Sequence, residues 1–289
     1  MKYFVFSDVH GCYNRLCEEL EKKGFDENNQ DHMLISLGDN FDRGKENYQM
    51  FLFLKRMKEK QKIVLIRGNH EDIFMRMMIS GKTTTTDYSN GTYNTIEEFA
   101  MTYFGKRGYG MFKRDFASLY YKFKGEGIFD LIDDMLDFYE TKDYVFTHGF
   151  IPIDNSDGYK YNPSWRTVDR DVFYTARWIN GIEMSIIKNI GEPNKKIVIG
   201  HKCIKRARIL KGEDESDLSI YEDNNIIALD AHTALTNHLN IFVFEEEWYF
   251  IPLFNFKCYL VGKNYIICYN SIKDKIKESR ILIWKELEK

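Results

Sequence analysis

The sequence predicts an α/β fold in which short buried strands alternate with helices. Six apolar runs of three to five residues are each followed or ended by a cluster of polar residues. A short apolar run bounded by glycine is typical of a buried strand, and helical patterns fill gaps between the runs. The predicted strands are Tyr3–Phe6, Met33–Leu37, Ile63–Ile66, Tyr144–Phe146, Ile197–Ile199 and Ile226–Leu229.

Three helices are predicted between the first strands. Asn14–Lys23 is followed by Gly24, which suits a helix C-terminus. Glu46–Lys60 repeats its apolar residues at near-helical spacing and ends in basic residues. Glu71–Ile79 is rich in methionine, which favours a place in the packed core over a recognition surface.

Residues 80–142 are interpreted as a helical insertion. The segment begins with a polar stretch and continues as helices rich in Phe and Tyr. It contains one apolar stripe with helical spacing, formed by Ile128, Leu131, Ile132, Met135 and Leu136. Two interpretations are open: the insertion is a cap over a functional site, or it is a purely structural helical layer.

The chain 1–289 is interpreted as one domain, with residues 245–289 as a C-terminal extension. That extension is expected to hold two strands, Trp248–Pro252 and Tyr265–Tyr269, and a charged terminal helix. No apolar stretch approaches the ~18 residues of a membrane span, and the first apolar run is too short for a signal peptide.

Net charge and cysteine spacing bear on the expected binding partners and on the cellular compartment. A net charge of −3 gives no electrostatic reason to expect binding to nucleic acid or to an anionic membrane. Five scattered cysteines show no paired spacing, which favours a reducing cytoplasm. The sequence does not indicate the oligomeric state.

The polar clusters after the strands contain many of the chain's metal-binding residue types. In open α/β sheets ligands bind beyond the carboxyl ends of strands, so we expect the clusters to meet in one crevice. Each cluster alone is explained better by turn chemistry or by an ordinary hydrogen-bonded histidine than by a metal site. The ordered combination of Asp, His and Asn indicates a divalent-metal site. The clusters are Asp8-Val9-His10-Gly11, Gly38-Asp39-Asn40-Phe41-Asp42-Arg43-Gly44, Arg67-Gly68-Asn69-His70-Glu71, Thr147-His148-Gly149, Gly200-His201 and Asp230-Ala231-His232.

This ordered set resembles the calcineurin-like metallophosphoesterase superfamily, and within it the phosphoprotein phosphatase group. The resemblance spans residues 3 to 244. Its most specific parts are Gly38-Asp39-Asn40-Phe41-Asp42-Arg43-Gly44 and Arg67-Gly68-Asn69-His70-Glu71. It implies a four-layer α/β/β/α metallophosphoesterase sandwich with a helical cap insertion.

The resemblance also implies two divalent metal ions. Asp8 and His10 would hold the first metal, and Asp39 would bridge the two. The second metal would be held by Asn69, His148 and His201. Carboxylate, imidazole and amide ligands suit Mn²⁺, which we favour, with Fe or Zn²⁺ as alternatives.

The same resemblance assigns catalytic roles to His70 and Asp42. His70 would be the general acid that protonates the leaving group, and Asp42 would orient its imidazole. The alternative for His70 is a direct metal ligand. The role of His232, which stands where relatives usually have a small residue, is left open.

Arginines are the candidates for phosphate binding. Arg43 follows Asp42, and a guanidinium fork matches two phosphoryl oxygens. A second phosphate-binding arginine is expected between the His148 and His201 clusters. Arg177 is the better placed candidate, and Arg166 is its rival.

Departures from other superfamily patterns narrow the expected activity. His201 is followed by Lys202 and Cys203, without the second histidine of the nuclease pattern, and Asp42 is kept. We therefore expect metal-dependent hydrolysis of phosphate monoesters, with phosphoserine and phosphothreonine of proteins or a small phosphate ester as substrates. The alternative is a symmetrical dinucleoside polyphosphate hydrolase that acts on diadenosine tetraphosphate. A non-catalytic scaffold is disfavoured, because the ligand set and the His70–Asp42 pair are intact.

Overall fold

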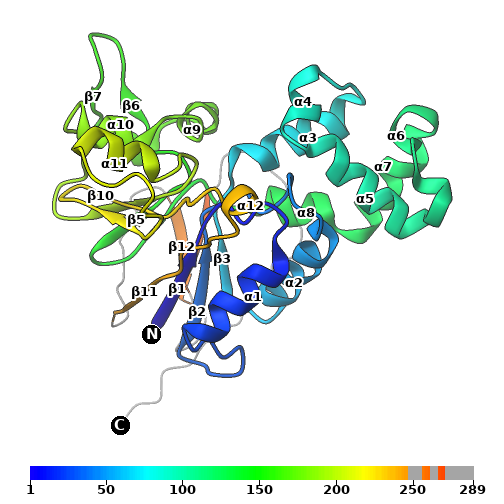
Figure 1. Cartoon of the computed structure of the whole chain (residues 1–289), viewed down its shortest axis with the longest axis horizontal. Helices are drawn as coiled ribbons and strands as arrows, with labels where there is room; N and C mark the ends of the chain where they lie inside the picture. Colours follow the sequence, from blue (N-terminus) through cyan, green and yellow to red (C-terminus); the bar gives the residue numbers. More distant parts are fainter. Residues whose placement is uncertain (247–255, 261–265, 271–289) are drawn as a thin grey trace. The chain divides into compact units, whose positions relative to one another are not determined.

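The computed structural model describes residues 1–246 and the two segments 256–260 and 266–270 (Figure 1). The chain divides into two units, Met1–Trp248 and Tyr249–Lys289. The first unit contains a four-stranded and a five-stranded sheet with helices on their outer faces.

The first sheet has the strand order β11-β1-β2-β3. It consists of β1 (Lys2–Phe6), β2 (His32–Ser36), β3 (Ile63–Leu65) and β11 (Phe242–Glu245). The first three strands are parallel, with Val5 opposite Ile35, and β11 pairs antiparallel with β1. The three predicted N-terminal strands are confirmed.

The second sheet has the order β4-β5-β8-β10-β9. Its parallel centre is formed by β5 (Tyr144–Phe146), β8 (Lys196–Ile199) and β10 (Ile226–Ala228), which confirms the other three predicted strands. The antiparallel edge strands β4 (Tyr139–Glu140) and β9 (Tyr221–Glu222) were not predicted. Each has two residues, which is too short to leave a periodic pattern in the sequence.

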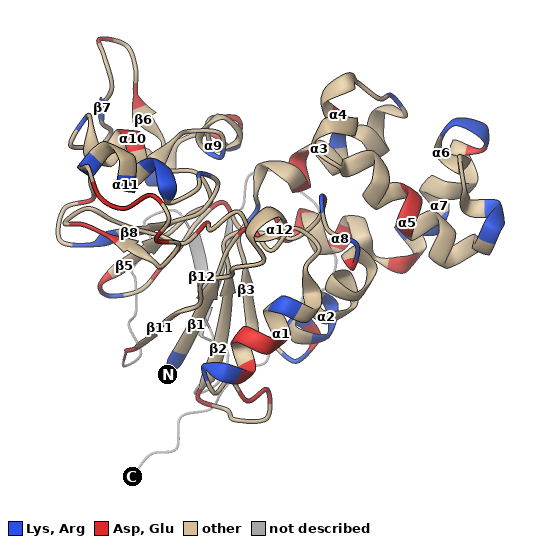
Figure 2. Ribbon diagram, viewed as in Figure 1, with Lys and Arg blue, Asp and Glu red and all other residues tan. Residues whose placement is uncertain are grey.

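Helices cover the outer face of each sheet (Figure 1). The first sheet shares its core with α1 (Tyr13–Lys22), α2 (Asn47–Glu59) and α3 (Asn69–Ser80). The second shares its core with α9 (Arg170–Ala176), α10 (Gly181–Ile186) and α11 (Lys205–Lys211). This arrangement is the predicted α/β/β/α sandwich. Figure 2 shows acidic and basic residues interspersed along α1 and α2.

Smaller elements complete the first unit. A hairpin is formed by β6 (Ile153–Asp154) and β7 (Lys160–Tyr161), and η2 (Trp165–Thr167) precedes α9. The short helix α12 (Thr233–Thr236) follows β10. No helix in the described part of the chain combines the length and apolar character needed to cross a bilayer.

Residues 85–133 form a group of helices that packs on α2 and α3. Its aromatic side chains belong to the core of the first sheet: Phe99 and Phe123 are fully buried, and the Phe123 ring stacks on Phe74 of α3 at 6.1 Å. In the predicted apolar stripe, Ile128, Leu131, Ile132 and Met135 are buried. The elements are α4 (Thr85–Ser89), α5 (Thr92–Phe104), η1 (Gly105–Gly108), α6 (Met111–Arg114), α7 (Phe116–Glu126) and α8 (Ile128–Asp133).

The second unit contains an antiparallel hairpin of β12 (Phe256–Leu260) and β13 (Ile266–Asn270), with Cys258 opposite Cys268. The predicted strand Tyr265–Tyr269 largely coincides with β13. The predicted strand Trp248–Pro252 and the terminal helix lie outside the described residues.

Aromatic rings join the two sheets of the first unit. Phe244 of β11 stacks on its cross-strand neighbour Tyr3 at 4.8 Å. From the other sheet, Tyr144 and Phe146 of β5 lie 4.8 and 5.7 Å from the Phe244 ring. Because these rings fill the space between the sheets, Phe244 fixes how the strand ends of one sheet face those of the other.

We expect Phe244→Ala to lower the free energy of unfolding by about 3 kcal/mol, since truncating a buried Phe leaves a cavity between the sheets. Urea denaturation measures the loss. Leu235→Ala is the control, because Leu235 is 80% exposed and should change stability by less than about 0.5 kcal/mol. A Phe244→Ala loss as small as that of the control contradicts the assigned packing.

Candidate active site

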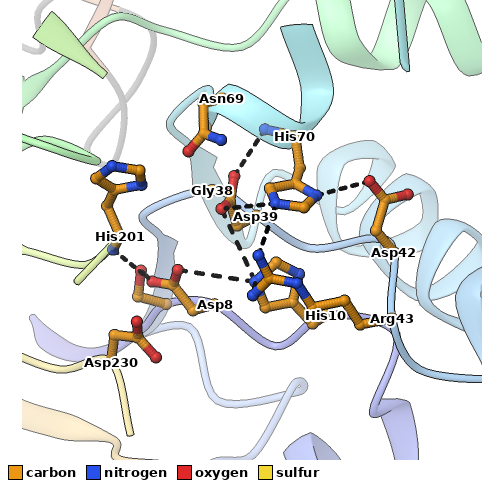
Figure 3. Close-up of polar contacts among 12 residues, drawn as sticks. Asp8, His10, Gly38, Asp39, Asp42, Arg43, Asn69, His70, His201 and Asp230 are labelled. Atoms are coloured by element: carbon orange, nitrogen blue, oxygen red, sulfur yellow. Dashed lines mark hydrogen bonds and ion pairs between the residues drawn. The ribbon is translucent and has the colours of Figure 1, made fainter. Parts of the chain in front are cut away.

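The predicted polar clusters meet at the carboxyl ends of the strands (Figure 3). Asp8 and His10 follow β1, and Asp39 follows β2. Asn69 and His70 form the first turn of α3, directly after β3. His148 follows β5, and His201 follows β8. The parallel order of the strands therefore gathers residues that are up to 193 positions apart in the chain.

The backbone at this edge is unusual. Four of the six predicted metal ligands have left-handed φ angles: 52° at Asp8, 48° at His10, 52° at Asp39 and 66° at His201. Residues other than glycine rarely adopt this conformation, and such residues concentrate at functional sites. The chain therefore turns sharply after β1, β2 and β8, at the positions of these four predicted ligands.

Asp39 lies in the middle of the site. Its Oδ1 is 3.3 Å from His148 Nε2, and its Oδ2 is 3.9 Å from Nε2 of both His10 and His70. Two groups of candidate metal ligands share this carboxylate, one with His10 and His70 and the other with His148 and His201. This geometry supports the predicted bridging role of Asp39. It also keeps open the alternative in which His70 is a ligand.

The histidine rings are fixed through their outer nitrogens. Nδ1 of His10 donates to the Phe41 carbonyl at 2.9 Å, and Nδ1 of His148 donates to the Leu37 carbonyl at 2.8 Å. Such hydrogen bonds fix the tautomer and leave Nε2 as the atom that can bind a metal. In the part of the chain that the structure describes, Nε2 of His201 is buried without a hydrogen-bond partner. An unpaired buried acceptor of this kind fits a divalent cation.

Asn69 and Asp8 complete the predicted ligand set. The Asn69 side-chain oxygen lies 2.9 Å from His148 Nε2. Asp8 accepts hydrogen bonds from the Ser7 hydroxyl at 2.5 Å and from the backbone N–H of His201 at 2.9 Å. The structure thus gathers all six predicted ligands, with oxygen and imidazole donors suited to the metals named above.

The raised pKa values of His148 and Asp230 reflect the buried carboxylates around them. Burial lowers the pKa of His148, but Asp39, Asp8 and Glu71 outweigh this effect and raise it to about 9. Burial and the neighbouring His148 lower the pKa of His201 to about 3, so its ring is neutral and suited to bind a metal. Burial, with Asp8 nearby, raises the pKa of Asp230 to about 7. A bound cation would relieve this repulsion between carboxylates.

His70 and Asp42 form a buried pair beside Asp39. His70 Nδ1 is 2.6 Å from Asp42 Oδ2, and both side chains are at most 2% exposed. Burial lowers the pKa of His70, but the Asp39 and Asp42 carboxylates outweigh it, so the pKa is raised. The pair has the geometry expected for an acid and the carboxylate that orients it.

Arg43 reaches the same point from its own loop. Its Nη1 lies 2.8 Å from His10 Nε2, and its Nη2 lies 3.1 Å from His70 Nε2 (Figure 3). Two donors cannot face each other, so the guanidinium must leave His70 Nε2 when that nitrogen carries a proton. Arg43 therefore lies beside His10 and His70, and its predicted role in phosphate binding stays a prediction.

The two other candidate arginines are already paired with carboxylates. Arg177 is 4% exposed and donates to Asp72 at 2.8 Å and to Asp137. Arg166 donates to Glu140 at 2.5 Å and to Glu192 at 2.7 Å. Among the described residues, Arg177 Nε is still buried without a hydrogen-bond partner. The second phosphate-binding arginine stays a prediction.

Sequence reasoning gave no role to Glu71, which is buried at the centre of the loops. Its carboxylate accepts the backbone N–H groups of Gly68 at 2.9 Å, Asp39 at 3.0 Å and Asn40 at 2.9 Å. Glu71 is the third residue of α3 and bonds to the N-cap residue Gly68, as in a capping box. The sequence did carry one signal for this role: Glu71 stands three positions after Gly68, the N-cap residue of α3.

The comparisons with known proteins agree with this geometry. The family model described as calcineurin-like phosphoesterase matches residues 1–234. An asymmetrical bis(5'-nucleosyl)-tetraphosphatase, PrpE, of Bacillus velezensis is 24% identical over 268 residues, which cover 86% of this chain and 90% of that protein. PrpE of Halalkalibacterium halodurans is 30% identical over 104 residues, 34% of this chain and 41% of that protein.

A phosphatase is among the relatives as well. Serine/threonine-protein phosphatase 1 of Salmonella typhimurium is 29% identical over 92 residues, which cover 32% of this chain and 40% of that protein. The chain thus spans less than half of this phosphatase and of the H. halodurans relative. The relatives' names fall into two substrate classes, so the substrate has to be argued from the site.

We expect the wild-type chain to bind two Mn²⁺ ions and Asp39→Asn to weaken both, because one carboxylate lies in both groups of ligands. Metal content after gel filtration, measured by mass spectrometry, gives the stoichiometry. Asp157→Asn is the matched control, since that side chain is 92% exposed. If Asp39→Asn empties one site and leaves the other at wild-type affinity, Asp39 does not bridge.

Proposed function

Since the chain belongs to the calcineurin-like phosphoesterase family, whose reaction is phosphoester hydrolysis, we propose that it hydrolyses phosphate monoesters, including phosphoserine and phosphothreonine in proteins. The observation that carries the proposal is the buried His70–Asp42 pair beside Asp39, joined at 2.6 Å. A general acid at this place is most useful when the leaving group is a poor one, such as the alkoxide of serine.

Two divalent metal ions held by Asp8, His10, Asp39, Asn69, His148 and His201 would lower the pKa of a water molecule and neutralise phosphoryl charge. The remaining work falls to the chain's own residues. Arg43 offers two parallel N–H donors to the phosphoryl oxygens, and its present partners are ring nitrogens that it can release. It thereby orients the ester for attack from the side opposite the leaving oxygen.

His70 donates the proton that the leaving oxygen needs. The proton leaves from Nε2, because Nδ1 is held by Asp42. Asp42 keeps the ring in one orientation and stabilises its protonated form, which agrees with the raised pKa of His70. Solvent then returns a proton to the ring after the alcohol departs.

A second candidate substrate is a dinucleoside polyphosphate. Trp178 favours it, because this side chain is 42% exposed and its ring packs edge-on against His201 at 6.0 Å. An exposed indole beside the metal ligands offers a stacking surface for a nucleobase. The relatives named as tetraphosphatases include both asymmetrical and symmetrical enzymes, so the position of cleavage is part of the question.

A turnover panel with Mn²⁺ separates the two substrate classes. We expect kcat/KM to be higher for a phosphoserine peptide than for diadenosine tetraphosphate, with p-nitrophenyl phosphate as a substrate that needs no acid. Each assay is repeated with a chelator and with Asp39→Asn, which should both abolish turnover. If diadenosine tetraphosphate has by far the highest kcat/KM, the dinucleotide activity is the correct one.

His70→Asn tests the role of the acid. We expect it to lower kcat for the phosphoserine peptide by about 10²–10⁴-fold, the usual contribution of a general acid. The loss should be much smaller for p-nitrophenyl phosphate, because nitrophenolate leaves without a proton. Metal content is measured on the same samples. Loss of a metal ion from His70→Asn would identify His70 as a ligand instead.

A further inference from the structure

Within the described residues, the carboxylate of Asp42 has two side-chain hydrogen-bond partners besides His70, and both come from the helical insertion. Thr92 Oγ1 donates to Asp42 Oδ2 at 2.5 Å, and Thr95 Oγ1 donates to Asp42 Oδ1 at 2.7 Å. All three side chains are at most 1% exposed. Each oxygen of Asp42 is therefore held by a threonine, and the oxygen bound by Thr92 is also the one that faces His70.

The two threonines lie on the first turn of α5. Residues three apart on a helix lie on the same face, so both hydroxyls reach one carboxylate. Gly91, the N-cap residue of this helix, lies directly against the loop of Asp42 and Arg43: a Cβ there would be 2.6 Å from the backbone nitrogen of Arg43. The positive end of the helix thus rests on the Asp42–Arg43 segment, where a negative side chain is stabilised.

A second contact from α5 holds the backbone of the same loop. Glu98 accepts hydrogen bonds from the Asn47 side chain at 2.7 Å and from the backbone N–H of Tyr48 at 2.9 Å. Asn47 in turn accepts the backbone N–H of Asp42 at 2.8 Å. This support is needed, because Asp42 and Arg43 have consecutive left-handed φ angles of 76° and 65°.

We propose that Thr92 and Thr95 are positioning residues of the general acid, which hold the Asp42 carboxylate in the orientation that binds His70 Nδ1. The proposal rests on the proposed function, since it gives a catalytic purpose to an element outside the sheets. Without the two hydroxyls, His70 Nδ1 would be the one side-chain donor left to the Asp42 carboxylate among the described residues, and no other group would fix the orientation of that carboxylate. The helical insertion is then part of the catalytic apparatus.

A purely structural role of the Thr92 and Thr95 hydroxyls predicts a different result. If the hydroxyls only satisfy a buried charge, their removal lowers stability and reduces turnover of every substrate by a similar factor. If they position the acid, the loss depends on the leaving group. Substrates that need a proton suffer, and substrates that do not are spared.

The test uses Thr92→Val, Thr95→Val and the double variant, which remove the hydroxyls but keep the shape of the side chains. We expect each single variant to lower kcat for the phosphoserine peptide by about ten- to hundredfold, the usual range for a hydrogen bond to a charged group. The kcat for p-nitrophenyl phosphate should stay within about twofold, and bound Mn²⁺ should be unchanged.

Three controls accompany these variants. Thr92→Ser and Thr95→Ser keep the hydroxyl and should recover most of the activity. Thr102→Val removes a hydroxyl that bonds within α5 at an exposed position, so kcat should not change. Thr95→Val added to Asp42→Asn should cause little further loss, because the carboxylate on which the hydroxyl acts is gone.

An activity-independent measurement separates this proposal from the function on which it rests. The His70 Nδ1 proton is expected as a downfield NMR signal that is lost or shifted in the valine variants and kept in the serine variants. If the wild-type protein hydrolyses none of the substrates in the panel, the proposed function is wrong. The NMR signal still tests whether Thr92 and Thr95 hold the Asp42 carboxylate against His70. Equal losses of kcat for both leaving groups, or an unchanged NMR signal, overturn the positioning role.

Discussion

The arrangement of the site depends on one buried carboxylate, Glu71. Glu71 accepts hydrogen bonds from the backbone N–H of Asp39, in the loop after β2, and of Gly68, in the loop after β3. It thereby holds together the two loops that carry Asp39 and Asn69. The loops are close enough that a Cβ on Gly68 would lie 2.4 Å from the Asp39 nitrogen. Glycine at this position and a carboxylate at Glu71 are therefore both required for Asp39 to reach the middle of the site.

Burying several carboxylates in the site raises the electrostatic free energy of the folded protein. Asp8, Asp39, Glu71 and Asp230 are all buried within one region, and their carboxylates repel one another. The chain offsets part of this cost with N–H and hydroxyl donors, such as Ser7 and the His201 backbone on Asp8. Cations would offset more of it, so we expect metal binding and stability to be linked.

The sequence predicted the parts of the molecule that leave a local pattern. The six strands Tyr3–Phe6 to Ile226–Leu229 were predicted because each is a short apolar run. The candidate metal ligands were predicted because they follow these runs in an order that resembles a known family. The edge strands β4 and β9 have too few residues for a pattern. The ion pairs of Arg177 with Asp72 and Asp137 join residues 105 and 40 positions apart, and no local signal reports them. Thr92 and Thr95 were missed for the same reason, since they lie 50 and 53 positions from Asp42.

The groups that suit the two substrate classes lie beside different candidate metal ligands. The acid pair, Arg43 and the first turn of α5 lie with His10 and His70, whereas Trp178 lies with His148 and His201. A leaving oxygen must face His70 to receive its proton, so the part of the ester that departs belongs on the α5 side. Trp178 is then available to the part of the substrate that stays with phosphorus or to the surface around it.

A phosphoserine side chain uses the acid and has no need of the indole. A dinucleotide uses the indole but has a phosphate leaving group that needs the acid much less. The buried His70–Asp42 pair serves a leaving alkoxide far more than a leaving phosphate, which is why we place monoester hydrolysis ahead of dinucleotide cleavage.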